Sequence, residues 1–285
     1  MKKNNQINKF SQKVGARVSH RIFAPIALLL SAAISALVFS LSYNADTRYI
    51  VTSPISIAFY AIIIAELAAA ILFASSYFQP TLTTDNGTFT RISALILHIA
   101  VIICGAMVMA TSKNMVFSID ALKSVGNNRS SFRASDLLKA ILLLSSASIF
   151  TSSPSLRKTR ESYGTSCQIH DYSTIFFCIS AIALLYFDMS VEMNNPQKML
   201  MQFALSSICL MTLYKMKWNI QGNSARISRL FELFTIILAP AASISTFIAM
   251  SERSNSLPAP YFYLAIAVAA YAIDRAVAII AQKEK

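Results

Sequence analysis

Long apolar runs separated by short polar stretches dominate the chain. An α-helix needs about 20 mostly apolar residues to cross the roughly 30 Å hydrocarbon core of a membrane. Eight runs approach or exceed this length, at residues 22–43, 50–78, 92–111, 137–155, 172–189, 199–216, 230–250 and 261–281. The pattern predicts an all-α polytopic transmembrane helix bundle of about eight spans, with six as the lower bound.

The run at 137–155 is the weakest of the eight. It is short, carries Lys139 near its start and becomes polar after Leu144. The polar stretch before it, residues 112–136, repeats apolar side chains at helical spacing, which predicts a short helix lying in the membrane interface. These side chains are Met115, Ile119, Leu122 and Val125.

Composition supports a membrane protein. Of 285 residues, 55% are hydrophobic and only 13% are charged, whereas soluble domains contain about 25% charged residues. The net charge is +12. Because Lys and Arg flank the apolar runs, we interpret this charge as a topology signal that also attracts anionic lipid headgroups, and we expect no nucleic-acid binding.

The basic residues also predict the orientation. If the spans alternate, 17 of the 25 Lys and Arg residues fall on the side of the N-terminus. Because cytoplasmic loops carry an excess of Lys and Arg, both termini are predicted to be cytoplasmic. The chain divides into a basic N-terminal segment (1–21), the bundle (22–281) and a short tail (282–285). Two alternatives stay open for the first segment: an amphipathic helix on the inner leaflet, or an unstructured tail.

Five polar residues within the predicted spans form a candidate intramembrane polar cluster. A charge at the centre of a membrane helix costs about 3 kcal/mol, so such residues either have a function or join helices. Glu232 and Arg275 are expected at similar depth and are predicted to form an interhelical ion pair. The cluster is read either as a proton or cation site or as polar contacts between helices. Its members are Glu66, His98, Glu232, Asp274 and Arg275.

Two further expectations concern residues within the spans. Pro240 is predicted to kink the seventh span and free a backbone carbonyl one turn earlier. His20, His98 and His170 fall on different predicted segments and are expected to lie far apart. His170 with Asp171 begins the fifth span, where a solvated pair is expected.

The stretch "YFDMSVEMNNPQK" (186–198) between the fifth and sixth spans supplies a candidate outer hairpin site, Asp188, Glu192, Asn194 and Asn195. If the fifth helix continues to residue 193, the two acids stack one turn apart and favour a cation or a Lys partner, with Lys198 nearby. Asn195 before a proline is expected to break the helix. The stretch is either a binding site or the polar tip of a hairpin.

This stretch also carries a resemblance. Residues 185–205, "LYFDMSVEMNNPQKMLMQFAL", with the pattern YFDM followed by MNxPxK, resemble a segment of a family of uncharacterised multi-span membrane proteins from clostridia-like Firmicutes. The resemblance covers about a tenth of the chain. It implies a bacterial plasma membrane and, because the family has no function to transfer, nothing about chemistry.

Motifs for catalysis, metals and cofactors are not recognisable in the sequence. Cys104, Cys167, Cys178 and Cys209 form no CxxC or Cys/His group, and no phosphate-binding, dinucleotide-binding or hydrolase motif is present. The sequence therefore predicts a non-enzymatic protein without a cofactor: an accessory subunit, sensor or assembly factor that binds a membrane protein partner or a second copy. A small ion-coupled transporter is the alternative, and an intramembrane enzyme comes third.

Overall fold

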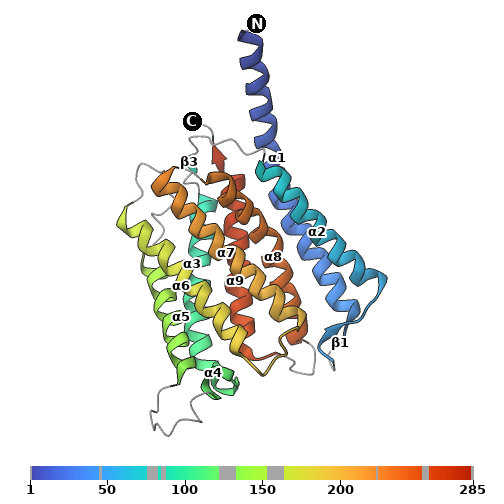
Figure 1. The fold of residues 1–285 in the computed structure, drawn as a ribbon, viewed down its shortest axis with the longest axis vertical. Coiled ribbons are helices and arrows are strands. Elements are labelled where there is room, and N and C mark those ends of the chain that lie inside the picture. The colour runs from blue at the N-terminus through green and yellow to red at the C-terminus, as the bar shows by residue number, and fades with distance from the viewer. Residues whose placement is uncertain are drawn as a thin grey trace.

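A computed structural model of the chain describes residues 2–44, 47–75, 83–84, 88–121, 133–152, 164–222, 224–251 and 257–283. Most of these residues lie in long α-helices that run side by side along the molecule (Figure 1). Within the described residues, eight helices are long and apolar enough to cross a membrane. The predicted all-α polytopic bundle of eight spans is therefore confirmed.

The helices follow the order of the apolar runs. They are α1 (Lys2–Ser42), α2 (Pro54–Ser75), α3 (Thr88–Thr111), α4 (Ser118–Ala121), α5 (Ala134–Thr151), α6 (Thr165–Phe187), α7 (Pro196–Gln221), α8 (Ala225–Ser251) and α9 (Ala259–Ile280). The connections contain the 3₁₀ turn η1 (Ser112–Asn114) and the strands β1 (Tyr43–Asn44), β2 (Tyr49–Ile50), β3 (Thr83–Thr84) and β4 (Gln282–Lys283). The weakest predicted span is present as α5.

Two small strand pairs mark opposite ends of the bundle. The antiparallel pair β1–β2 joins α1 to α2 at the end that we call distal. The antiparallel pair β3–β4 joins the segment before α3 to the end of α9 at the other end, which we call terminal because both termini lie there (Figure 1). An even number of crossings requires this placement, so the expectation that the termini share a side is met.

Helix α1 is much longer than a span requires. Its 41 residues extend about 61 Å at 1.5 Å per residue, roughly twice the hydrocarbon thickness. The spanning part is Arg21–Ser42, and the residues before it continue the same helix beyond the bundle (Figure 1). The expected boundary after residue 21 is therefore not a break in the backbone, and an unstructured tail is not observed. The amphipathic face predicted for this segment concerns side chains outside the described residues.

The predicted interface helix between the third and fourth spans is short where it is described. One helical turn, α4, follows η1 at the distal end. Two of the residues on which the prediction rested, Leu122 and Val125, lie outside the described residues.

Six of the spans form a closed ring. Each helix packs against the next in the order α3, α5, α6, α7, α8, α9, and α9 packs back against α3. Apolar side chains from all six helices fill the middle of the ring, among them Leu142, Phe177, Leu205, Ala239 and Val268. The remaining two spans, α1 and α2, pack against each other and against the outside of α8, and α1 also contacts α9.

Close approach between α3 and α5 depends on one glycine. A Cβ atom placed on Gly105 would lie 2.5 Å from the Ser146 Oγ, 2.7 Å from the Ser146 Cβ and 3.3 Å from the Leu143 Cα. Small residues allow membrane helices to approach closely enough for dispersion contacts between backbones. Gly105 therefore sets the distance between these two helices.

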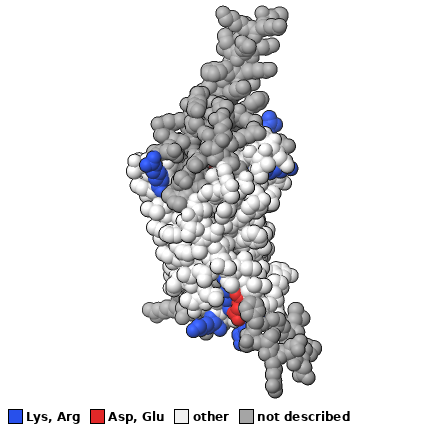
Figure 2. Space-filling view, turned by 90° about the vertical axis from the view of Figure 1, so that its left-hand side faces the viewer, with Lys and Arg blue, Asp and Glu red and all other residues white. Residues whose placement is uncertain are grey.

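The surface supports placement in a membrane. On the face drawn in Figure 2, Lys and Arg lie toward the two ends of the molecule, and its middle carries no charged residue. Large apolar side chains are exposed along the spanning helices, including Leu29, Ile64, Leu72 and Leu144. Exposed apolar side chains are favourable when lipid surrounds them, so the molecule is a multi-pass membrane protein in contact with a bilayer.

Pro240 lies inside α8, which continues through it to Ser251. Because proline has no N–H, the Ile236 carbonyl one turn earlier lacks its usual intrahelical donor. The kink predicted at Pro240 stays a prediction. The following carbonyl, that of Ile237, accepts a hydrogen bond from the Ser31 hydroxyl of α1. The backbone around Pro240 therefore helps to join α8 to α1.

Candidate functional site

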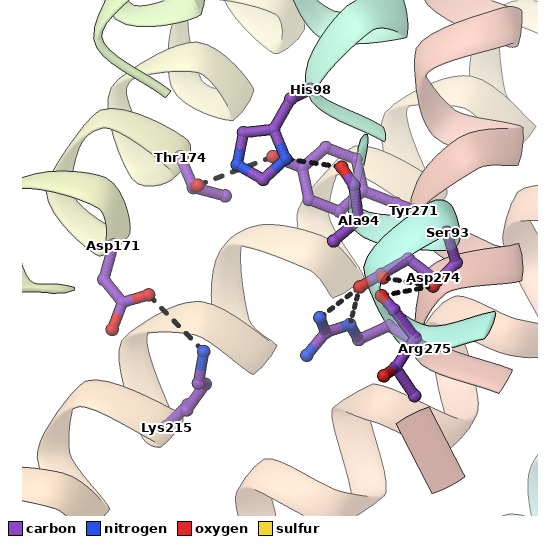
Figure 3. A network of polar contacts seen from close by, with 10 residues as sticks. Ser93, Ala94, His98, Asp171, Thr174, Lys215, Tyr271, Asp274 and Arg275 are labelled. Atoms are coloured by element: carbon purple, nitrogen blue, oxygen red, sulfur yellow. Dashed lines mark hydrogen bonds and ion pairs between the residues drawn. The ribbon is translucent and has the colours of Figure 1, made fainter. Parts of the chain in front are cut away.

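A network of polar side chains lies near the terminal end of the ring, around the first turns of α3 and the last turns of α9 (Figure 3). Asp274 of α9 is 1% exposed. One of its carboxylate oxygens accepts a hydrogen bond from the Ser93 hydroxyl of α3 at 3.0 Å. The other accepts hydrogen bonds from the Arg275 guanidinium, through Nε at 3.1 Å and also through Nη2. This carboxylate is therefore neutralised and hydrogen-bonded inside the bundle.

Two histidines meet beside this pair, contrary to expectation. The rings of His98 on α3 and His170 on α6 have centroids 5.4 Å apart. His170 also interacts electrostatically with Lys215, Arg275 and Asp274, so these groups belong to one cluster. The prediction that the histidines lie far apart is wrong for this pair, because α3 and α6 face one another across the ring.

His98 is half satisfied. Its Nδ1 is hydrogen-bonded to the Ala94 carbonyl of its own helix, as Figure 3 shows. Its Nε2 is buried and has no hydrogen-bond partner in the described part of the chain. If Nδ1 carries the proton that the carbonyl accepts, Nε2 is a free acceptor inside the ring.

Asp171 is buried rather than solvated. It is 3% exposed and forms an ion pair with Lys215 of α7, with Nζ 3.6 Å from Oδ1. One turn farther along α6, Thr174 accepts a hydrogen bond from the Tyr271 hydroxyl of α9 at 3.4 Å. The expected solvated pair of His170 and Asp171 is therefore wrong, since the two residues contact different helices. Together these contacts connect α3, α6, α7 and α9 across the ring.

A serine and a histidine also meet here, but not as a nucleophile and its base. The Ser152 Oγ lies 3.1 Å from the His170 Nδ1. The Ser152 hydroxyl donates its proton to the Ile149 carbonyl at 3.1 Å. An activated serine must give its proton to the imidazole. If the Ser152 proton stays in the hydrogen bond to the Ile149 carbonyl, the imidazole donates to the serine oxygen, which is the reverse of an activated serine.

The predicted ion pair between Glu232 and Arg275 does not form. Glu232 accepts a hydrogen bond from Arg229, one turn earlier on α8, at 2.7 Å. Arg275 is held by its neighbour Asp274. Glu232 acts on Arg275 only through longer-range attraction. Glu232 and Arg275 lie at similar depth, but each forms its ion pair with a residue of its own helix, Glu232 with Arg229 and Arg275 with Asp274.

Glu66 is separate from this cluster. It lies on α2, outside the ring, and is 6% exposed. Neither carboxylate oxygen has a hydrogen-bond partner among the described residues. Of the five residues predicted to cluster, the structure thus brings His98, Asp274 and Arg275 together, leaves Glu232 at the edge and places Glu66 elsewhere.

A second polar cluster closes the distal end of the ring. Helix α6 ends at Phe187, so Asp188 and Glu192 do not stack on one helix. Asp188 is 1% exposed and accepts hydrogen bonds from the Ser190 backbone N–H and hydroxyl, and from the Tyr261 hydroxyl of α9 at 3.1 Å. Lys198 lies close by, but its ammonium contacts the backbone and not the two carboxylates as predicted: it donates to the carbonyls of Asp188 at 2.6 Å and Val191 at 3.0 Å.

Asn195 and Pro196 begin α7 as expected. The Asn195 side chain accepts a hydrogen bond from the Lys198 N–H, which satisfies one of the unpaired donors of the first turn, and Pro196 occupies the first helical position. The Asn195 amide also donates to the Arg48 carbonyl of the β1–β2 turn at 3.1 Å. Arg48 in turn donates to the Ser190 carbonyl at 3.1 Å. The hairpin tip is therefore fastened to the α1–α2 turn.

Glu192 and Asn194 face the solvent side of the same junction. Both accept hydrogen bonds from the Tyr49 hydroxyl of β2, Asn194 at 2.6 Å. The hydrogen bond to the Glu192 carboxylate raises the pKa of Tyr49 above its ordinary value, because it stabilises the neutral phenol. The four predicted hairpin residues thus divide into two buried structural residues, Asp188 and Asn195, and two exposed acceptors.

Sequence reasoning missed several partners. Lys215, Thr174, Tyr271 and Tyr261 complete the clusters, and none was selected as a site residue. The sequence did offer a signal for the ion pair. Asp171 lies at the start of the fifth predicted span and Lys215 near the end of the sixth, so the two opposite charges were expected on the same side of the membrane. In the described ranges no group of three or more His, Cys, Asp and Glu side chains is arranged to hold a metal ion.

Comparisons with known proteins give no relative. No protein-family model, curated protein or solved structure matches the chain. The resemblance of residues 185–205 to a family of uncharacterised Firmicutes membrane proteins therefore stays a prediction.

Proposed function

We propose that the protein is a non-enzymatic multi-pass protein of a bacterial plasma membrane that acts through association with another membrane component, as an accessory subunit, sensor or assembly factor. The observation that carries this proposal is the pairing of buried charges within the chain. Asp274 is held by Arg275, Asp171 by Lys215 and Glu232 by Arg229. Paired groups of this kind join helices and are not poised for proton transfer or nucleophilic attack.

Affinity purification tests the association. The full chain with a small C-terminal tag is isolated from its native membrane in mild detergent, and the proteins that accompany it are identified by mass spectrometry. A stoichiometric protein partner, or a defined homo-oligomer, is expected. A monodisperse monomer without a partner would contradict the proposal. An unrelated multi-pass protein with the same tag, prepared in parallel, controls for proteins that follow any membrane protein.

The orientation belongs to the same proposal. With the terminal end in the cytoplasm, the basic residues near that end lie on the side that membrane insertion favours for positive charge. Single cysteines in a cysteine-free variant, one at the C-terminus and one replacing Asn194, test it with a membrane-impermeant maleimide. Labelling of intact cells at residue 194 alone is expected. Labelling at the C-terminus alone would reverse the orientation.

A small ion-coupled transporter is the second candidate. Polar residues line the ring interior at both ends, around Asp274 and around Asp188, with an apolar layer between them. This arrangement favours a path along the ring axis that opens alternately. Proteoliposomes of wild type, Asp274→Asn and Asp188→Asn would be compared in proton and sodium flux assays. Flux that falls in the variants would favour the transporter over the association role.

A further inference from the structure

Glu66 differs from every other carboxylate described within the membrane spans. The side chains of Asp171, Glu232 and Asp274 each accept from a cationic side chain. Glu66 has no such partner, although it is more than nine-tenths buried. It lies about 18 Å along α2 from Pro54, near the middle of the span. An acid in this position therefore needs a hydrogen-bond partner other than a cationic side chain.

The surroundings of Glu66 are apolar. It shares the buried face of α2 with Phe59, Ile63 and Ala70. This face packs in one core with apolar residues of α1 and α8, among them Ile236 and Ile237. An ionised carboxylate in such surroundings costs several kcal/mol, and in proteins such a group takes up a proton instead.

No charge from the neighbouring helices offsets this cost. The helices that pack against α2 are α1 and α8. Within their spans the charged residues are Arg21 on α1, and Arg226, Arg229 and Glu232 on α8, all in the first turns at the terminal end. A metal cation would therefore find a single charged ligand here.

The same core supplies an acceptor without a donor. Pro240 deprives the Ile236 carbonyl of its intrahelical hydrogen bond. Ile236 is fully buried and lies about 22 Å along α8 from Ser251, at nearly the same depth from the distal end as Glu66. An unpaired carbonyl and an unpaired carboxyl group, on adjacent helices at similar depth, satisfy each other only if the carboxyl group carries a proton.

We propose that Glu66 is a proton-binding site at the centre of the membrane, where its neutral carboxyl group donates to the Ile236 carbonyl that Pro240 leaves free. The site lies between α2 and α8, outside the helix ring. It goes beyond both candidate functions, because a proton held here is independent of the clusters inside the ring. Release of the proton would leave a buried negative charge and favour separation of α2 from α8.

Reaction with a carbodiimide tests the site on the full chain in detergent micelles. Dicyclohexylcarbodiimide is apolar and reacts with protonated carboxyl groups: the acid proton moves to one nitrogen, and the carboxyl oxygen bonds to the central carbon. Peptide mass spectrometry at neutral pH is expected to show the adduct at Glu66, decreasing as the pH rises. Asp274 is the matched internal control, since its carboxylate is held by the Arg275 guanidinium, and it is expected to stay unmodified.

Two results would overturn the proposal. One is a folded, monodisperse protein in which Glu66 stays unmodified at neutral pH. The other is protection of Glu66 by Na⁺ or Li⁺, relative to choline at the same ionic strength and pH, which would make the site a metal-cation site instead.

Infrared spectroscopy tests the acceptor separately. The carbonyl-stretch band of a protonated carboxyl group is expected in the wild type and should disappear in Glu66→Gln. In Pro240→Ala the new backbone N–H donates a hydrogen bond to the Ile236 carbonyl. Because the Glu66 acid then loses its acceptor, its carbonyl-stretch band is expected to persist and to move to higher frequency. An unchanged band in Pro240→Ala would exclude Ile236 as the partner.

Discussion

The α1–α2 hairpin and the helix ring treat a buried acid in opposite ways. Glu66 in the hairpin and Asp274 in the ring both lie in alanine-rich apolar helices, and the sequence gives little to separate them. Asp274 receives donors from its neighbour Arg275 and from Ser93 on α3. Glu66 receives none among the described residues. Helix α9 has ring neighbours on both sides. Among the described helices, α2 packs mainly against α1 and α8.

The difference has two causes: Asp274 has an arginine next to it in the sequence, and α9 also has more neighbouring helices that can supply donors such as Ser93. A helix inside a ring meets side chains from several directions, so hydrogen-bond donors can surround a charge. A peripheral helix faces lipid over much of its surface, as the exposed Ile57, Ile64 and Leu72 of α2 show. Lipid tails offer no hydrogen bonds, so an acid on such a helix has a lower free energy when its carboxyl group is protonated than when it is ionised.

The largest effect is expected from separating Asp274 and Arg275. Arg275→Ala would leave a buried carboxylate without its counter-charge, which costs about 3–5 kcal/mol of unfolding free energy. Unfolding by titration with a denaturing detergent, followed by circular dichroism, measures this loss. The control is the double variant Asp274→Asn with Arg275→Ala, which removes the uncompensated charge and should recover part of the stability. Equal losses in the single and double variants would show that the ion pair is not the cause.

An intermediate effect is expected at the contact between α3 and α5. Gly105→Ala places a methyl group against Ser146 and should cost about 1–3 kcal/mol through overpacking. The gain in helix propensity on replacing glycine, about 1 kcal/mol, works in the opposite direction, so a net loss would be informative. The matched control is Gly164→Ala, where a Cβ atom would meet nothing within 4 Å. Ser146→Gly should rescue Gly105→Ala, and a failure of rescue would contradict the steric explanation.

A smaller effect, neutral or of opposite sign, follows for Glu66. Glu66→Leu replaces an acid that has no charged partner with an apolar side chain, so the unfolding free energy should stay within about 1 kcal/mol of wild type or rise. Asp274→Leu, the corresponding change in the ring, leaves Arg275 unpaired and should destabilise strongly. The same detergent titration compares the two variants. Equal losses at both positions would remove the distinction between hairpin and ring.

The spans were predictable because span length and apolarity are local properties of the sequence. Even α5, with Lys139 in its second turn, was identified. The structure places this lysine beside Asp136 at 3.2 Å and over the Phe117 ring at 5.0 Å, which explains how a span tolerates it. The turn after α6 was predicted only in outline: Asn195 before Pro196 was expected to break the preceding helix, whereas α6 already ends at Phe187 and Asn195 caps the start of α7.

The partners of the polar residues could not be predicted in the same way. A sequence gives the depth of a residue in its span, but not which helices are neighbours or which way a side chain faces. Glu232 and Arg275 were predicted to pair because they lie at similar depth. Arg229, one turn from Glu232 on the same helix, forms the ion pair with Glu232 instead. His98 and His170 were separated for the opposite reason. Only the closed order of the ring, in which α3 faces α6, brings them together.

The smallest effect concerns the exposed junction between the hairpin and the ring, where Tyr49 donates to Glu192 and Asn194. Glu192 raises the pKa of Tyr49 and Asn194 lowers it. Glu192→Gln should therefore lower the pKa of Tyr49 toward its ordinary value, whereas Asn194→Ala should raise it further. Carbon NMR of labelled tyrosine, with Tyr49→Phe to assign the signal, measures both shifts.

Because the pKa of Tyr49 is raised in the folded protein, this contact contributes to stability below the ordinary tyrosine pKa of about 10, and the contribution is lost as the pH rises through the raised value. A lowered pKa in Glu192→Gln with no shift in Asn194→Ala would show that Tyr49 senses charge alone, and that the Asn194 hydrogen bond does not join the hairpin to the ring.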